Sequence, residues 1–239
     1  MTAKQNKMKN ILTFIITVFS VGSIANAQSN KDLTSHFEKY YSQMLAQGDV
    51  QGIISALTHL NILEPNVARQ DTLAAYYMND GKHLQALNTI GIDANDSDSM
   101  LAVEVKAISL QALGQNELAL VQFEKLFLKN PNVAIAYEIA DLKIQADDLT
   151  GARMKITYGL ANSTDEMTHT YYETQQPYQV SMKSAFTYLE GILIFKESPE
   201  KNIDKAVAKL DLALASDPNF NLASLSKNAL LSRKEQTKE

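Results

Sequence analysis

Cysteine is absent from this chain of 239 residues, and so is tryptophan. The lack of cysteine excludes disulfide bonds, thiol catalysis, cysteine-based metal sites and lipid attachment through cysteine. The chain therefore has to be held together by packing alone, which local contacts between helices can provide. Glycine is also scarce, with nine residues, and none of them forms a phosphate-binding glycine motif.

Clustered basic charge is missing as well. The chain has 22 lysine and arginine residues against 27 aspartate and glutamate residues, which gives a formal net charge of −5. Proteins that bind the phosphate backbone of nucleic acids need clustered Lys and Arg. We therefore expect no nucleic-acid partner.

Residue types that support catalysis or metal binding are scattered. The four histidines lack the H-x-x-x-H and H-E-x-x-H spacings that hold zinc, so we expect no metal and no cofactor. The nearest grouping of a nucleophile with a base is Ser163, Asp165, Glu166 and His169. Proximity in sequence does not establish the geometry of a catalytic triad, and a polar loop is the simpler interpretation. We therefore predict no catalytic residues and no enzymatic activity.

The first 27 residues have the pattern of a secretory signal peptide. Three lysines precede an apolar stretch at residues 11–24, and Ala25-Asn26-Ala27 fits the small-residue cleavage pattern. We predict cleavage after Ala27 and a periplasmic or secreted mature chain. A membrane anchor is the alternative, but the apolar stretch is short for a span of about 20 residues. No later stretch is long and apolar enough, so we expect no membrane span in the mature chain.

A period of 33 residues runs through the rest of the chain. Gly48, Gly81 and Gly114 are each 33 residues apart, and Asp147 stands one further step on. Alanines repeat with the same period at two other positions, namely Ala74, Ala107 and Ala140, and Ala86, Ala119 and Ala152. Self-similarity at a fixed period is the signature of a repeat array.

Each repeat has the pattern of a helical hairpin. Apolar residues recur at helical spacing on both sides of the Gly or Asp position, where a glycine can adopt the positive φ that ends a helix. Pro65 and Pro131, two periods apart, block continuation of the second helix. The predicted helix pairs are residues 31–63, 67–91, 99–130, 132–162 and 180–217, with a capping helix at about 219–233.

One unit of this pattern resembles the tetratricopeptide repeat. That family has a small residue, a turn Gly or Asp, an Ala, an aromatic residue and a terminal Pro, and here these positions hold Ala107, Gly114, Ala119, Phe123 and Pro131. The resemblance covers roughly residues 31–232. It implies an all-α fold, a right-handed α–α superhelix (a TPR-like solenoid) of about five helix pairs plus a capping helix. The chain departs from the family at three aromatic positions, which hold Leu57, Ile90 and Ile156.

The period breaks once, between residues 164 and 184. Thr, Tyr and Val are frequent there and favour strands, so we predict a small β-hairpin at 166–183, with an irregular loop as the alternative. Either structure places Tyr171, Tyr172 and Tyr178 together, and tyrosine is common at contact surfaces as well as in plain packing.

The predicted organisation has three parts. Residues 1–27 are the signal peptide, residues 28–233 are the helical repeat domain with the insertion at 164–184, and residues 234–239 are a disordered tail.

The resemblance also implies a binding groove. In tetratricopeptide proteins two positions on the first helix of each pair face a concave surface. Carried over to this sequence, the first set is Glu38, Asp71, Glu104, Tyr137 and Tyr188, and the second is Ser42, Ala75, Ile108, Asp141 and Ile192. This predicts a groove with acidic and aromatic ends that favours a basic or neutral extended peptide. The alternative for the acidic residues is a solvated face.

We therefore expect a non-catalytic protein–protein interaction scaffold in the periplasm or extracellular space. It would bind a protein or peptide partner on the concave face, at the tyrosine-rich insertion, or at both. The alternatives are a binding module for a cell-wall glycan or peptide fragment, because aromatic faces can contact sugars, and a hydrolase that uses the insertion. The sequence identifies neither the partner nor the oligomeric state.

Overall fold

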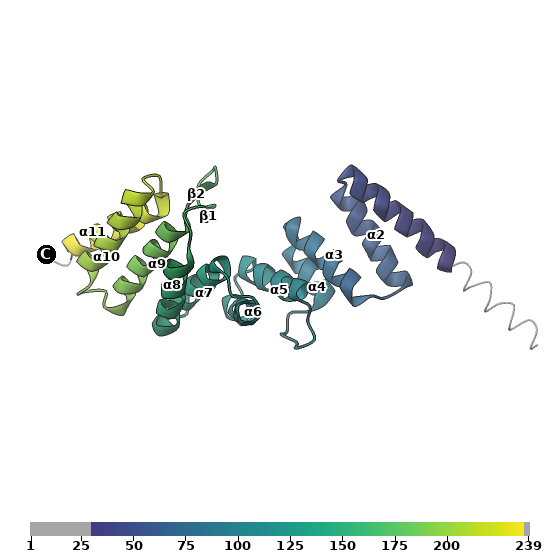
Figure 1. Cartoon of the computed structure of the whole chain (residues 1–239), viewed down its shortest axis with the longest axis horizontal. Coiled ribbons are helices and arrows are strands. Elements are labelled where there is room, and N and C mark those ends of the chain that lie inside the picture. Colours follow the sequence, from purple (N-terminus) through teal and green to yellow (C-terminus); the bar gives the residue numbers. More distant parts are fainter. Residues whose placement is uncertain (1–29, 237–239) are drawn as a thin grey trace, which may run out of the picture. The chain divides into compact units, whose positions relative to one another are not determined.

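The computed structural model describes residues 30–236, in which eleven helices pack in adjacent pairs and two short strands form a hairpin (Figure 1). The predicted signal peptide at residues 1–27 lies outside the described residues. The helices belong to two compact units, one that ends at Gly91 and one that begins at Ile92.

The first unit contains two helix pairs. A helix over the described residues 30–47 precedes α2 (Val50–Leu63), and α3 (Val67–Asn79) precedes α4 (His83–Ile90). Its core joins Met44 of the first helix to Leu57 of α2 and Leu73 of α3. The helix pairs predicted at 31–63 and 67–91 are therefore confirmed.

The second unit contains three helix pairs and a final single helix. The pairs are α5 (Met100–Ala112) with α6 (Asn116–Lys129), α7 (Val133–Gln145) with α8 (Leu149–Asn162), and α9 (Met182–Glu197) with α10 (Ile203–Ser216), followed by α11 (Asn221–Gln236). Within each pair the two helices pack on each other, and α9 also packs on α8 and α11 on α10. The predicted all-α, TPR-like arrangement of paired helices is confirmed.

The periodic turn positions share one backbone conformation. Gly48, Gly81 and Gly114 have φ angles of 68°, 71° and 72°, and Asp147 has a φ of 61°. This left-handed conformation ends a helix and lets its last carbonyls accept hydrogen bonds. After α5, for example, the backbone N–H of Gln115 donates to the Leu110 carbonyl at 2.8 Å. The period of 33 therefore marks the helix ends.

The periodic alanines are fully buried. All six, Ala74, Ala86, Ala107, Ala119, Ala140 and Ala152, have no exposed surface. Small side chains at buried positions allow two helices to approach closely, and larger residues fill the space around them. Phe123 is buried at the family's aromatic position, and Leu57 and Ile156 are buried at the equivalent places.

The insertion forms the predicted hairpin. Strand β1 (Thr168–Tyr171) pairs with β2 (Tyr178–Ser181) in an antiparallel register that sets Tyr171 opposite Tyr178. Both strands contact α9, and Figure 1 shows them at the ends of α8 and α9. Tyr171 and Val180 belong to the apolar core of the second unit. The hairpin is therefore anchored to the helices, and an irregular loop is not what forms.

The C-terminal helix is longer than the sequence indicates. Helix α11 continues through Lys234 to Gln236, so these three residues of the predicted disordered tail are helical. Lys234 forms an ion pair with Asp204 of α10, which holds the last turn of the helix against its neighbour. Residues 237–239 lie outside the described part of the chain. No helix between residues 30 and 236 is long and apolar enough to cross a membrane.

Candidate functional site

A groove in the second unit runs between α5 and α7, the first helices of two successive pairs. Its cavity of about 820 Å³ has an apolar lining from Ile108, Phe123, Leu126 and Ile135. Polar groups also line it, among them the carboxylates of Glu104 and Glu138. We call this cavity the apolar groove. The structure thus places two of the predicted groove residues, Glu104 and Ile108, on its wall.

A second cavity, of about 340 Å³, lies between α7, β1, α9 and α11. We call it the tyrosine socket. Its tyrosines are Tyr137, Tyr171, Tyr172 and Tyr188, and its carboxylates are Glu138, Asp141 and Glu173. Glu138 lines both cavities, so the tyrosine socket and the apolar groove adjoin at this side chain.

The aromatic wall of the socket is fixed by its own contacts. The hydroxyl oxygens of Tyr137 and Tyr171 are 2.6 Å apart and share a hydrogen bond in a buried position. The His169 ring lies against the Tyr137 ring, with 4.0 Å between centroids, and Phe220 lies behind Tyr171 at 4.9 Å. These rings cannot turn without breaking core contacts, so the wall is preformed.

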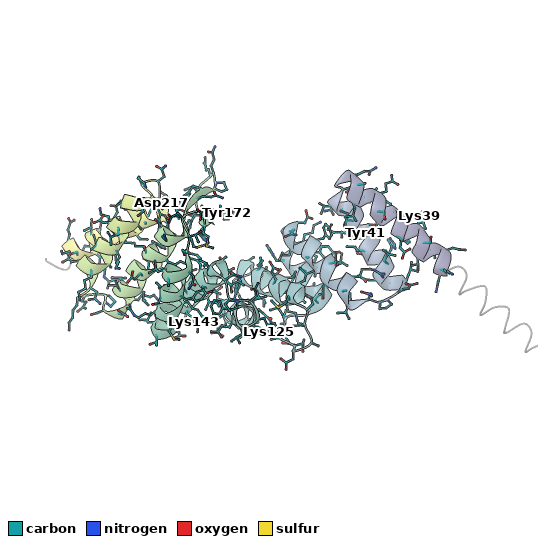
Figure 2. All side chains as sticks on the ribbon, in the orientation of Figure 1. Lys39, Tyr41, Lys125, Lys143, Tyr172 and Asp217 are labelled. Carbon is teal, nitrogen blue, oxygen red and sulfur yellow. The ribbon has the colours of Figure 1, made fainter. Side chains whose placement is uncertain are left out.

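The predicted tyrosines of the insertion have three different roles. Tyr171 is buried in the wall, whereas Tyr172 is 75% exposed, and Figure 2 shows its side chain beside the strands. Tyr178 does not line the socket. Its ring stacks behind Tyr171 with 5.6 Å between centroids, and its hydroxyl accepts a hydrogen bond from the backbone N–H of Leu222 at 3.1 Å. Tyr178 therefore fastens the hairpin to α11.

Two carboxylates in the socket are held by amides. The side-chain amide of Gln111 donates to Glu138 at 2.7 Å, and that of Gln145 donates to Asp141 at 2.8 Å. Burial raises the pKa of both carboxyl groups, although these hydrogen bonds lower it in part. Within residues 30–236 neither carboxylate forms an ion pair. The socket therefore carries negative charge that no lysine or arginine of the described chain neutralises.

The serine, acid and histidine of the insertion do not assemble as a catalytic group. The Ser163 hydroxyl donates to the Gly159 carbonyl at 2.6 Å, and Asp165 pairs with Lys183 at 2.6 Å. His169 instead lies against Tyr137 with the two rings tilted by 38°, and burial lowers its pKa to about 4, so the ring is neutral at pH 7. In the described residues no group of three or more His, Cys, Asp or Glu side chains could hold a metal ion.

The predicted groove residues of the first unit differ in exposure. Glu38 is exposed and lines a shallow cavity of about 330 Å³ with Tyr41, Arg69 and Thr72. Asp71 is only 5% exposed, so its carboxylate is not presented on the surface as the sequence indicated. The acidic positions that repeat in sequence therefore do not form a uniform acidic surface.

Sequence reasoning missed several side chains of the socket, among them Glu138, His169 and Glu173. Glu138 follows a predicted groove residue directly, but the family pattern does not single out its position. His169 was considered only as a base, whereas it lines the socket as a neutral ring against Tyr137. The one sequence signal for Glu138 is that an acidic residue directly follows the predicted groove position Tyr137.

Comparison with known proteins gives the fold alone. No protein-family model matches the chain, and no curated protein matches its sequence. Among solved structures, it is similar to a tetratricopeptide repeat protein from Parabacteroides merdae, with a TM-score of 0.62 and 17% identity over 86% of this chain and 76% of that one. It is also similar to MamA protein, with a TM-score of 0.57 and 14% identity over 79% of this chain and 93% of that one. The tetratricopeptide-like fold that the sequence predicts is thereby confirmed.

Proposed function

We propose that this chain, whose fold is that of tetratricopeptide repeat proteins, is a non-catalytic scaffold that holds an extended peptide of a partner protein. The observation that carries the proposal is the pair of adjoining cavities in the second unit. They meet at Glu138 and have volumes of about 820 and 340 Å³. Ligand cavities commonly measure roughly 300–1,000 Å³ and combine an apolar lining with a few polar groups.

The apolar groove suits the side chains of an extended peptide. Ile108 and Ile135 come from α5 and α7, and Leu126 comes from the end of α6. An aliphatic side chain placed among them would leave water for an apolar surface. The amides of Gln111, Asn130 and Asn132 line the same cavity and can bond to peptide groups.

Charge restricts the choice of peptide. Glu104 and Glu138 line the groove, and Asp141 and Glu173 line the adjoining socket, against one lysine, Lys129. Like charges brought together at an interface are costly, so an acidic peptide is disfavoured and a basic or neutral one is preferred.

A location outside the cytoplasm is part of the proposal. It is supported by the three lysines, the apolar stretch at 11–24 and the small residues ending at Ala27. N-terminal sequencing of the protein isolated from its source cells tests this point. A first residue of Gln28 in an envelope or culture fraction agrees with it, and an intact N-terminus in the cytoplasm contradicts it.

A glycan ligand is the second candidate, favoured by Tyr172. This side chain is 75% exposed next to the socket, where a sugar ring could stack on it. A glycan array with the mature protein separates the two candidates. Saturable binding that is lost in Tyr172→Ala favours the glycan, and no binding removes it.

Peptide selection tests the scaffold function directly. A displayed library of random short peptides is selected on the mature protein, and the affinity of enriched peptides is measured by calorimetry. Ile108→Asp should weaken binding about tenfold, equivalent to about 1.4 kcal/mol, because it places a charge in the apolar groove. Met154→Asp, at an exposed position of α8, is the matched control and should leave affinity unchanged. If no peptide is enriched, or if both variants bind like the wild type, the proposal fails.

A further inference from the structure

We infer that the tyrosine socket receives one arginine side chain of the bound peptide, an inference that rests on the proposed function. The guanidinium group would lie between tyrosine faces and the carboxylates of Glu138 and Asp141. The aliphatic part of the side chain would lie along the apolar surface of Leu222, which also lines the socket.

Charge complementarity is the first reason. The socket is lined by three carboxylates, and within the described residues no lysine or arginine lines it. Glu138 and Asp141 are three residues apart on α7, which sets them on the same face of the helix. Their only hydrogen-bond partners in residues 30–236 are the neutral amides of Gln111 and Gln145. A half-buried, unneutralised pair of carboxylates is stabilised when a cation arrives.

The aromatic lining is the second reason. A cation within about 6 Å of an aromatic ring centre is attracted by the negative face of the ring. Tyr137, Tyr171 and Tyr188 are buried and locked by ring contacts, so they need no reordering to receive a ligand. His169 is neutral at pH 7 because burial lowers its pKa to about 4, and therefore it does not repel a cation.

Size and shape select an arginine. A cavity of about 340 Å³ is at the small end of ligand sites and suits one long side chain better than a folded segment. The guanidinium is planar, stacks on aromatic rings and can donate to two carboxylates at once, whereas the ammonium of lysine is compact and strongly hydrated. The paired carboxylates and the tyrosine faces match the planar guanidinium of arginine.

An NMR titration with blocked amino acids tests the inference on the whole mature protein. The probes are the N-acetyl methylamides of arginine, of lysine and of citrulline, which has nearly the shape of arginine without the charge. Arginine should give saturable shifts in the tyrosine rings of the socket and at the backbone around Glu138, and lysine should bind several-fold more weakly. Citrulline should give no saturable shift. The inference is wrong if the citrulline probe binds as tightly as the arginine probe. It is also wrong if the lysine probe binds as tightly as the arginine probe.

Neutral variants locate the binding. Glu138→Gln together with Asp141→Asn should weaken arginine binding about tenfold while the side chains keep their size. Glu200→Gln removes one exposed carboxylate in the turn after α9 and serves as the control, with unchanged binding expected. An arginine affinity that survives the double substitution would place the probe elsewhere and overturn the inference.

The two proposals fail in different ways. If selected peptides bind in a manner that depends on Ile108 but show no preference for arginine, the socket inference is wrong and the scaffold function stands. If the arginine probe binds in the socket but no peptide is enriched, the scaffold function is wrong and the socket is a site for a free guanidinium compound.

Discussion

The hydroxyl oxygens of Tyr137 and Tyr171 lie 2.6 Å apart although the two residues are 34 positions apart in sequence. One belongs to α7 and the other to β1. This bond fixes the inserted hairpin to the helices. The segment that interrupts the 33-residue period therefore forms a wall of the tyrosine socket.

Removal of either hydroxyl should destabilise the second unit. Tyr137→Phe or Tyr171→Phe leaves the other buried hydroxyl without its partner, at an expected cost of about 1–3 kcal/mol in free energy of unfolding. The double Phe variant should lose less than the sum of the two single losses, because no unpaired hydroxyl remains. Urea unfolding measures all three, with the exposed Tyr172→Phe as a control expected to match the wild type. Strict additivity would contradict the account.

Glu138→Gln and Asp141→Asn should raise stability at pH 7. Burial raises the pKa of both carboxyl groups in the folded protein, so the folded chain binds their protons more tightly than the unfolded chain does. Their charged forms therefore cost stability above the folded-state pKa, and this cost disappears as the pH falls through it. Thermal unfolding between pH 7 and pH 4 should show the variants' advantage shrinking toward acid. An advantage that is independent of pH would contradict this explanation.

Lys106 should stabilise the segment with which the second unit begins. Its ammonium group is fully buried and donates to Asp98 at 2.8 Å and to the Asp93 carbonyl at 2.7 Å. Lys106→Met should cost about 3 kcal/mol, since it leaves the partly buried Asp98 with one cation fewer. Chemical unfolding measures the loss. Lys201→Met, at an exposed position, is the control and should change little.

The ion pair of Lys106 and Asp98 should also contribute to the loss of folding stability at acid pH. Burial raises the pKa of Asp98, but hydrogen bonds from Lys106 and the Asn95 backbone outweigh this and leave the pKa below its usual value. The resulting stability is complete above about pH 4, the ordinary aspartate pKa, and is lost as the pH falls through the folded-state value. Lys106→Met should therefore lose less stability than the wild type between pH 4 and pH 2. An equal loss in both proteins would show that Asp98 is not responsible.

The two kinds of turn residue should respond in opposite directions. Gly114→Ala puts a side chain at a φ of 72° and should cost about 1–2 kcal/mol, because a Cβ disfavours the left-handed conformation. Asp147→Gly removes that strain at a φ of 61°, but it also removes a largely exposed ion pair with Lys196, so a gain below about 1 kcal/mol is expected. Urea unfolding of both variants checks the signs. A loss from Asp147→Gly comparable with that from Gly114→Ala would contradict the role assigned to φ.

Even a methyl group at position 159 should destabilise the folded protein. A Cβ at this position of α8 would overlap the ring of Phe186, which is fully buried in α9. Gly159→Ala should cost about 1–3 kcal/mol through overpacking, despite the better helix propensity of alanine. Thr157→Ala lies on the exposed side of the same helix and should stay within about 0.5 kcal/mol of the wild type in thermal unfolding.

The sequence by itself determined the helix pairs, their turns and the inserted hairpin. These features depend on local rules: helical spacing of apolar residues, a positive φ at the periodic glycines, and strand-forming residues where the period breaks. The tertiary structure alone decided the socket. Only packing of α7 against β1, α9 and α11 brings Tyr137, Tyr171 and Tyr188 to one cavity, and only burial distinguishes Asp71 from Glu104. Spacing in sequence records which residues share a helix face, whereas exposure and convergence depend on the neighbouring elements that cover that face.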